Sequence, residues 1–146
     1  MTVQAVKKST VVNAPVEKVF AYLDDPTHWP DFWPSLMAVD GVEALPNGGK
    51  MRHWVYKMAG LRLEGTQEDV ERIENERIAS KTRGGVESTQ TWTMRPEGDG
   101  TEVAFTVEYT IPVPVMGKMA ESVLVRMNDH EIDATMANLK ALLESE

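Results

Sequence analysis

The sequence predicts an α+β domain, in which a curved antiparallel sheet of about seven strands is covered by one long C-terminal helix and two short helices follow the first strand. Residues 36–111 divide into segments of strand length, and the links between them are too short for a parallel crossover. Apolar and polar residues alternate within these segments, so only one face of the sheet needs a cover. Residues 114–146 are predicted to form the helix that supplies it.

Composition is that of a globular protein and removes several classes of function. The 146 residues are the size of one domain, and we expect residues 1–146 to form it. The absence of cysteine excludes disulfides, zinc–thiolate sites and cysteine nucleophiles. A net charge of −8 opposes binding to nucleic acid or anionic membranes. Because we find neither a membrane-span pattern nor a basic, apolar leader, we expect a cytoplasmic protein.

The N-terminal segment predicts a strand followed by a short helix. Residues 2–13 alternate weakly and contain several β-branched side chains, which is typical of a strand. Asn13, Ala14 and Pro15 end it, and proline is favourable at the start of a helix because its backbone angle is already helical. In residues 16–23 the apolar side chains recur at helical spacing and therefore form one buried face.

A proline-bracketed segment, residues 27–34, is rich in large aromatic rings. Its sequence, THWPDFWP, permits at most one helical turn. Trp29, Phe32 and Trp33 each carry a large apolar area that must be buried somewhere. We therefore expect this turn to act as a plug on the main core.

Residues 36–111 have the pattern of an antiparallel meander, because clusters of Gly, Pro, Asn and Asp interrupt them at regular intervals. The predicted strands are residues 36–45, 50–58, 61–73, 77–83, 86–95 and 101–111. Alternation assigns an inward-facing set to the apolar side of the sheet: Trp54, Tyr56, Met58, Leu61, Leu63, Gly65, Trp92, Met94, Val103, Phe105, Val107, Tyr109 and Ile111.

The predicted helix 114–146 has two apolar stripes, whereas a surface helix normally has one. One consists of Val125, Ile132, Met136, Leu139 and Leu143, and the other of Met116, Ala120, Val123, Met127, Ala134, Ala137 and Ala141. We expect the large residues to pack on the sheet and residues 116–127 to border a less tightly filled space. A homodimer contact along the alanine face is the alternative. Because a straight helix cannot touch a curled sheet everywhere, a pocket is expected between them.

Several short motifs add a resemblance to this order of elements. They are residues 13–23 (NAPVEKVFAYL), the pairs Asp25-Pro26, Trp29-Pro30 and Trp33-Pro34, the turn 98–103 (GDGTEV) and the ending 139–144 (LKALLE). Together they resemble the START-like (SRPBCC) superfamily with its helix-grip fold, and within it the polyketide cyclase/dehydrase-like branch. The resemblance covers the whole chain and implies the fold more specifically than an activity. It also implies a hydrophobic ligand in a cavity under the long helix, since the superfamily includes lipid and hormone carriers and aromatase/cyclases.

We expect such a cavity to be lined by Trp54, Tyr56, Met58, Leu63, Trp92, Met94, Phe105, Val107, Tyr109, Met116, Ala120, Val123 and Met127, although each of these could instead be ordinary core. Nine methionines are many for this length and suit an adaptable apolar surface. Tyr56 and Tyr109 could orient a carbonyl or phenol. Arg52 and Glu64 share the inward phase or lie near a phase switch, where a buried charge would be costly and therefore informative.

Three functions remain open on the sequence. The first is binding of a hydrophobic small molecule, lipid, aromatic or polyketide-like, in an apolar cavity of several hundred Å³. The second is an enzyme of the cyclase or dehydratase type, with Tyr56, Glu64 or Arg52 as acid, base or oxyanion support. The third is a protein-interaction module without a usable pocket.

No cofactor or metal site is predicted. The histidines, His28, His53 and His130, are not spaced as metal ligands, and His53 falls on the outward phase of its strand. The acidic segment 129–133 is expected to be a solvated helix surface.

Overall fold

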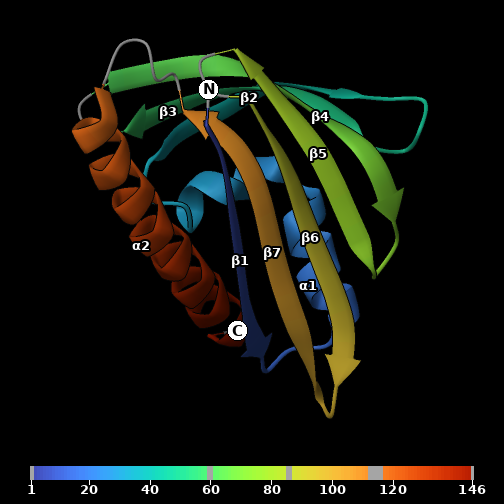
Figure 1. The fold of residues 1–146 in the computed structure, drawn as a ribbon. Helices are drawn as coiled ribbons and strands as arrows, with labels where there is room; N and C mark the ends of the chain where they lie inside the picture. The colour runs from blue at the N-terminus through green and yellow to red at the C-terminus, as the bar shows by residue number, and fades with distance from the viewer. Residues whose placement is uncertain (1, 59–60, 85–86, 112–116, 146) are drawn as a thin grey trace.

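The computed structural model describes residues 2–58, 61–84, 87–111 and 117–145, with side chains described within 5–57, 62–84, 87–110 and 125–145. The described residues form seven strands, two α-helices and a 3-10 helix (Figure 1). In order they are β1 (Thr2–Val12), α1 (Val16–Asp24), the 3-10 helix η1 (Pro26–Asp31), β2 (Leu36–Ala44), β3 (Lys50–Met58), β4 (Leu61–Ile73), β5 (Arg77–Gly84), β6 (Glu87–Glu97), β7 (Gly100–Ile111) and α2 (Gly117–Glu144).

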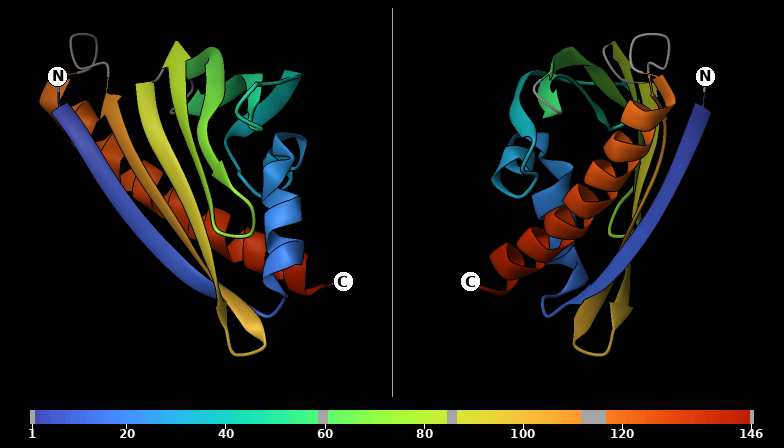
Figure 2. Two further views of the ribbon diagram at one scale, coloured as in Figure 1. Left: turned by 90° about the vertical axis from the view of Figure 1, so that its right-hand side faces the viewer. Right: turned by 60° about the vertical axis from the view of Figure 1, so that its left-hand side comes forward.

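The strands form one antiparallel sheet in the order β1-β7-β6-β5-β4-β3-β2. Consecutive strands from β2 to β7 are neighbours, as short turns require, and β1 pairs with β7. The sheet curves around α2, and α1 and η1 lie on the same side of it (Figure 2). The predicted α+β architecture is therefore confirmed, and the strand limits agree within a few residues. Of the predicted helix 114–146, residues 114–116 and 146 lie outside the described part.

The core lies between the sheet and the helices and is centred on aromatic rings. Trp92 and Phe105, on neighbouring strands, are fully buried with ring centroids 4.4 Å apart. Phe32 packs edge-on against Trp92 at 6.2 Å, and Trp33 packs edge-on against Phe105 at 5.4 Å. Trp29 is buried as well. The expectation that the aromatic turn plugs the core is thus confirmed.

α2 packs on the sheet through the stripe that has the bulkier side chains, the one that contains Ile132. Ile132, Met136, Leu139 and Leu143 are buried and belong to the main core cluster. Of the second stripe, Met127 is 45% exposed, and the side chains of residues 116–123 lie outside the described part. No helix among the described residues is both long enough and apolar enough to cross a membrane.

Candidate ligand pocket

A pocket of about 80 Å³ lies between the sheet, η1 and α2. Its lining comes from these elements and the loop after η1: Trp29, Trp33, Leu36, Trp54, Tyr56, Gln67, Thr82, Ser88, Gln90, Val107, Tyr109, Asn128 and Ile132. The expected volume of several hundred Å³ is wrong for this conformation. The large rings of Trp92 and Phe105 fill much of the space that the curled sheet leaves under α2.

One side of the pocket is an aromatic wall held in place by indole hydrogen bonds. Trp29 Nε1 donates to the Leu23 carbonyl at 3.0 Å, at the end of α1. Trp54 Nε1 donates to the Thr66 carbonyl at 3.0 Å, on the neighbouring strand. Because each bond uses the one polar atom of its indole, the part of each ring that lines the pocket is apolar.

The position of the Trp54 ring depends on Gly65 beside it. A Cβ at Gly65 would lie 2.7 Å from the Trp54 ring and 1.9 Å from the Arg83 carbonyl oxygen. Both distances are far below van der Waals contact, so only glycine fits where β4 approaches β5 and the ring at once.

The floor of the pocket is polar, because strand register lines up polar inward-facing residues in rows across the sheet. One row runs through Arg52, Gln67, Thr82, Ser88 and Tyr109, on β3, β4, β5, β6 and β7. The next row contains Asp69, Ser80, Gln90 and Val107. Further along the strands the row Ile78, Trp92 and Phe105 is apolar. The sheet thus changes from core to polar floor within a few residues of each strand.

The floor side chains bond mainly to one another. Gln67 Nε2 donates to Ser80 Oγ at 2.7 Å and to Gln90 Oε1 at 3.0 Å. The hydroxyls of Thr82 and Ser88 lie 2.6 Å apart. A buried network whose members satisfy each other is a rigid surface, so the floor is set before any ligand arrives.

Tyr56 ties the pocket to α2. Its hydroxyl donates a hydrogen bond to Glu131 Oε2, while Glu131 Oε1 accepts from the Ser35 amide at 2.6 Å. Burial raises the pKa of Tyr56, and the negative charge and hydrogen bond of Glu131 raise it further. Tyr56 is therefore a neutral donor at physiological pH. The acidic segment 129–133 is not a simple solvated surface, because Glu131 clasps two other elements and Asp129 and Asp133 pair with Lys8.

Tyr109 differs from Tyr56 although it lines the same pocket. Its side chain is only 6% exposed, and its hydroxyl has no hydrogen-bond partner among the described residues. Burial raises the pKa of Tyr109, and the nearby Asn128 side chain acts in the opposite direction. Tyr109 thus brings an unused donor to the pocket.

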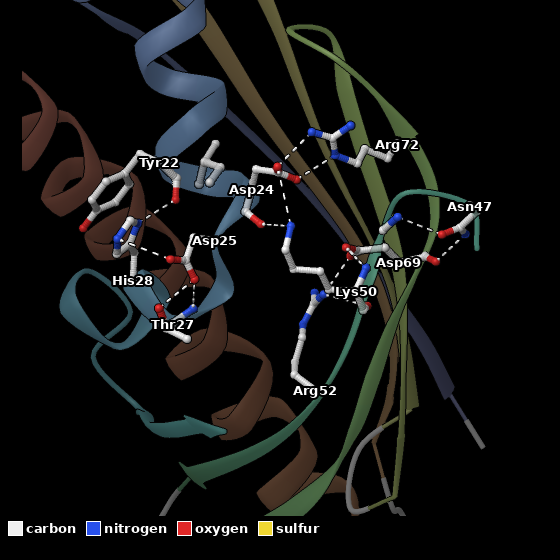
Figure 3. A network of polar contacts seen from close by, with 12 residues as sticks. Tyr22, Asp24, Asp25, Thr27, His28, Asn47, Lys50, Arg52, Asp69 and Arg72 are labelled. Atoms are coloured by element: carbon white, nitrogen blue, oxygen red, sulfur yellow. Dashed lines mark hydrogen bonds and ion pairs between the residues drawn. The ribbon is translucent and has the colours of Figure 1, made fainter. Parts of the chain in front are cut away.

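Arg52 and Asp69 form a buried ion pair (Figure 3). Arg52 Nη1 contacts Asp69 Oδ1 at 2.8 Å, and the Arg52 guanidinium stacks 4.7 Å from the centroid of the Trp29 ring. Burial lowers the pKa of Arg52 and Asp69 opposes this shift, so the guanidinium remains charged at neutral pH. Asp69 also accepts from the Lys50 amide at 2.9 Å. The pair supports Trp29 without lining the pocket itself.

A second carboxylate joins α1 to the same strands (Figure 3). Asp24 accepts from Arg72 Nε and Nη2, both at 2.9 Å, and lies 3.5 Å from Lys50 Nζ. Burial opposes ionisation of Asp24, but Arg72 and Lys50 outweigh it and hold the pKa of this carboxyl below its usual value.

Of the side chains predicted to line the cavity, Trp54, Tyr56, Val107 and Tyr109 do so. Trp92, Met94 and Phe105 are buried in the core cluster and Leu63 is half-buried away from the pocket lining. Met127 is exposed and absent from the lining, so that expectation is wrong. The side chains of Met58, Met116, Ala120 and Val123 lie outside the described residues.

The two charged candidates have opposite outcomes. Arg52 is 1% exposed, as its inward phase indicated. The expectation for Glu64 is wrong, since its side chain is 50% exposed and lies 3.5 Å from His53 on the outer face. The inward residues of β4 are Leu63, Gly65, Gln67 and Asp69, so Glu64 must point outward. His53 is on the surface, as its phase predicted.

Sequence reasoning missed most of the polar floor because it searched for apolar inward residues. Ser88 and Gln90 precede Trp92 and Met94 at the same two-residue spacing, so the alternation itself carried the signal. Trp29, Trp33 and Ile132 were predicted to be buried but not to line the pocket. Leu36 and Asn128 had no comparable signal, because the bend between η1 and β2 and the rotation of α2 place them.

The comparisons with known proteins agree with this geometry. Residues 3–144 match the family described as polyketide cyclase / dehydrase and lipid transport. The chain belongs to this family. No curated protein sequence matches the chain significantly.

Solved structures show the same fold at low sequence identity. TTHA0849 from Thermus thermophilus is 20% identical with a TM-score of 0.84, covering 96% of this chain and 97% of its own. The Zhui aromatase/cyclase from Streptomyces sp. R1128 is 15% identical with a TM-score of 0.80, covering 98% and 94%. A START superfamily protein from Mycobacterium smegmatis is 18% identical with a TM-score of 0.75, covering 94% and 98%. These likenesses concern the fold alone.

Within the described residues, no three His, Asp or Glu side chains come together in a way that could hold a metal ion.

Proposed function

We propose that this protein binds a small hydrophobic molecule, with a flat aromatic or similarly apolar body, in the pocket between the sheet and α2. Three tryptophans carry this proposal: Trp29, Trp33 and Trp54 line one space, and hydrogen bonds fix the rings of Trp29 and Trp54. The family match to polyketide cyclase / dehydrase and lipid transport proteins supports the same class of ligand.

The size of the pocket sets a condition on this binding. Pockets for drug-sized ligands usually have roughly 300–1,000 Å³, whereas this one has about 80 Å³. A ligand with more than one ring therefore requires the walls to move. Small single-ring compounds are the appropriate first probes.

The test is a titration of the purified protein with α-methylstyrene, followed by tryptophan fluorescence. We expect saturable quenching, because three tryptophans line the pocket. Ile132→Phe fills the pocket from α2 and should abolish binding, whereas Leu142→Phe adds the same ring at a position that is 37% exposed and should not. Circular dichroism would establish that both variants fold. Equal binding by the two variants would place the ligand elsewhere and contradict the proposal.

Mass spectrometry of freshly purified protein under gentle conditions gives a second readout. A co-purifying apolar compound that is lost from Ile132→Phe but retained by Leu142→Phe would support the pocket as its site.

A cyclase- or dehydratase-type enzyme remains the second candidate, and the Tyr56–Glu131 pair at the pocket edge is the observation that favours it. A tyrosine with a raised pKa is a poor base, so Tyr56 would stabilise a developing enolate oxygen by donating a hydrogen bond. The Tyr56 hydroxyl already donates to Glu131, so it would have to exchange this partner for the enolate oxygen. Any activity found should fall with Tyr56→Phe and Glu131→Gln, and intact turnover in both variants would remove the pair from catalysis.

A further inference from the structure

Two tyrosine hydroxyls belong to the pocket, and only one of them already donates a hydrogen bond within the protein. The Tyr56 hydroxyl donates to Glu131. The Tyr109 hydroxyl is buried and has no partner in the described part of the chain. A buried hydroxyl without a partner is unfavourable, so natural structures rarely keep one without a reason.

The surroundings of Tyr109 explain why the sheet leaves its hydroxyl unpaired. Tyr109 is directly opposite Ser88 in the β6–β7 register, but the Ser88 hydroxyl lies 2.6 Å from Thr82 Oγ1. Gln90, in the next row, bonds to Gln67. The polar side chains nearest to Tyr109 on the sheet are thus hydrogen-bonded to each other. Burial also favours the protonated form and raises the pKa of Tyr109, so the hydroxyl can donate at neutral pH.

The pocket has one more donor of this kind. Trp33 Nε1 is buried without a partner among the described residues, and an indole nitrogen can only donate. The Tyr109 hydroxyl and Trp33 Nε1 are thus two buried donors of the pocket lining without an acceptor among the described residues. An acceptor on the ligand would complete either of them.

We propose that the ligand carries an oxygen acceptor of the carbonyl or ether class, which receives a hydrogen bond from the Tyr109 hydroxyl while the apolar body lies against Trp29 and Trp54. The inference rests on the proposed function and adds to it the chemical class of the ligand. It makes Tyr109 a residue that determines specificity.

The test compares two probes of nearly the same shape, acetophenone and α-methylstyrene, which differ by a carbonyl oxygen in place of a CH₂ group. Affinities are measured by tryptophan fluorescence and by calorimetry. One hydrogen bond from a buried donor predicts roughly tenfold tighter binding of acetophenone to the wild-type protein. The ratio of the two affinities, and not either affinity alone, is the quantity that reports the bond.

Tyr109→Phe and Tyr22→Phe form a matched pair of variants, since each removes one phenol hydroxyl and only Tyr109 lines the pocket. Tyr109→Phe should bring the ratio close to one. Tyr22→Phe should keep the preference, because Tyr22 is not among the lining residues. Tyr109→Phe should also fold, because it removes only an unpaired polar atom.

The outcomes separate this inference from the proposed function. If neither probe binds the wild-type protein, both fail. If both bind equally well, the pocket takes apolar ligands and the acceptor inference is wrong. A preference for acetophenone that persists in Tyr109→Phe also overturns it, because another donor would then be responsible.

Discussion

At the scale of single residues, the buried guanidinium of Arg52 on β3 has the largest expected effect on stability near the site. Arg52 is 1% exposed, and two of its nitrogens, Nε and Nη2, have no partner among the described residues. Among the described residues it forms an ion pair with Asp69, which is also buried. Desolvated charges are tolerated only when they are paired, so the stability of this region depends on the pair remaining intact.

Asp69→Asn should therefore destabilise the protein strongly. Leaving a buried charge unpaired typically costs about 3–5 kcal/mol, measurable as a lower urea midpoint. The control is Glu102→Gln, which removes the partner of the exposed Arg95, 2.9 Å away, and should leave the midpoint almost unchanged. Similar losses in both variants would mean that burial of Arg52 does not govern its energetics.

Asp24 predicts a contribution to stability that depends on pH. Its folded-state pKa lies below the ordinary 3.8, so the unfolded chain binds this proton more tightly. The ion pairs of Asp24 therefore stabilise the fold fully above the unfolded pKa, and this contribution disappears as the pH falls from about 4 toward the folded pKa. Urea unfolding of the wild type and Asp24→Asn between pH 7 and pH 3 should show two curves that converge in acid. Parallel curves would contradict the assignment.

At the scale of elements, α2 is attached to the rest of the molecule at several points. Near its C-terminal end, Lys140 Nζ donates to the Val11 carbonyl at 2.8 Å, and Asn138 Nδ2 donates to the Phe32 carbonyl at 3.2 Å. Closer to its N-terminal half, Glu131 clasps Tyr56 and Ser35. Because Glu131 is one turn from the pocket residue Asn128, this clasp sets the distance between α2 and the aromatic wall.

Glu131→Gln should loosen that clasp. Hydrogen bonds to a charged acceptor contribute about 1.5–3 kcal/mol, so stability should fall by a similar amount. The pKa of Tyr56 should also fall below its wild-type value, because the charge that raised it is gone and only burial remains. Ultraviolet titration of the phenol would measure this. Asp133→Asn, on the same helix, is the control, and it should leave the Tyr56 titration unchanged.

At the scale of the whole molecule, core and pocket compete for the same space under α2. Ile132 belongs to both, since it is buried in the core cluster and lines the pocket. Leu139, two turns further along α2, is equally buried but does not line the pocket. A larger side chain at Ile132 would therefore fill the pocket, and a smaller one would remove core contacts.

Ala137 and Ala141 are exposed on the other side of α2, and a homodimer along that face stays a prediction.

Ile132→Ala should lower the stability of the fold and enlarge the pocket. Removing buried methylenes costs about 2–5 kcal/mol, and Leu139→Ala should cost a comparable amount. Only Ile132→Ala enlarges the pocket, so it alone should bind α-methylstyrene more tightly than the wild type when measured by calorimetry. Tighter binding by both variants would show that general loosening, and not pocket volume, limits the affinity.

Much of the fold followed from local patterns that the sequence alone contains. Alternation in β3, β4, β6 and β7, short turns and one long proline-free segment were enough for the antiparallel sheet and its helical cover, because strand and helix periods are properties of neighbouring residues. The buried aromatic turn and the inward-facing Arg52 followed from the same kind of argument. Glu64 was misplaced because its assignment departed from the two-residue period of β4.

The pocket itself was decided by tertiary structure. The row Gln67, Thr82, Ser88 and Tyr109 exists only because four strands align in one register, and no single strand contains that information. Whether Trp92 and Phe105 fill the space or border it depends on sheet curvature and on how closely α2 approaches. Spacing along the chain specifies which way a side chain points, whereas the volume left between two curved surfaces depends on every residue that packs there.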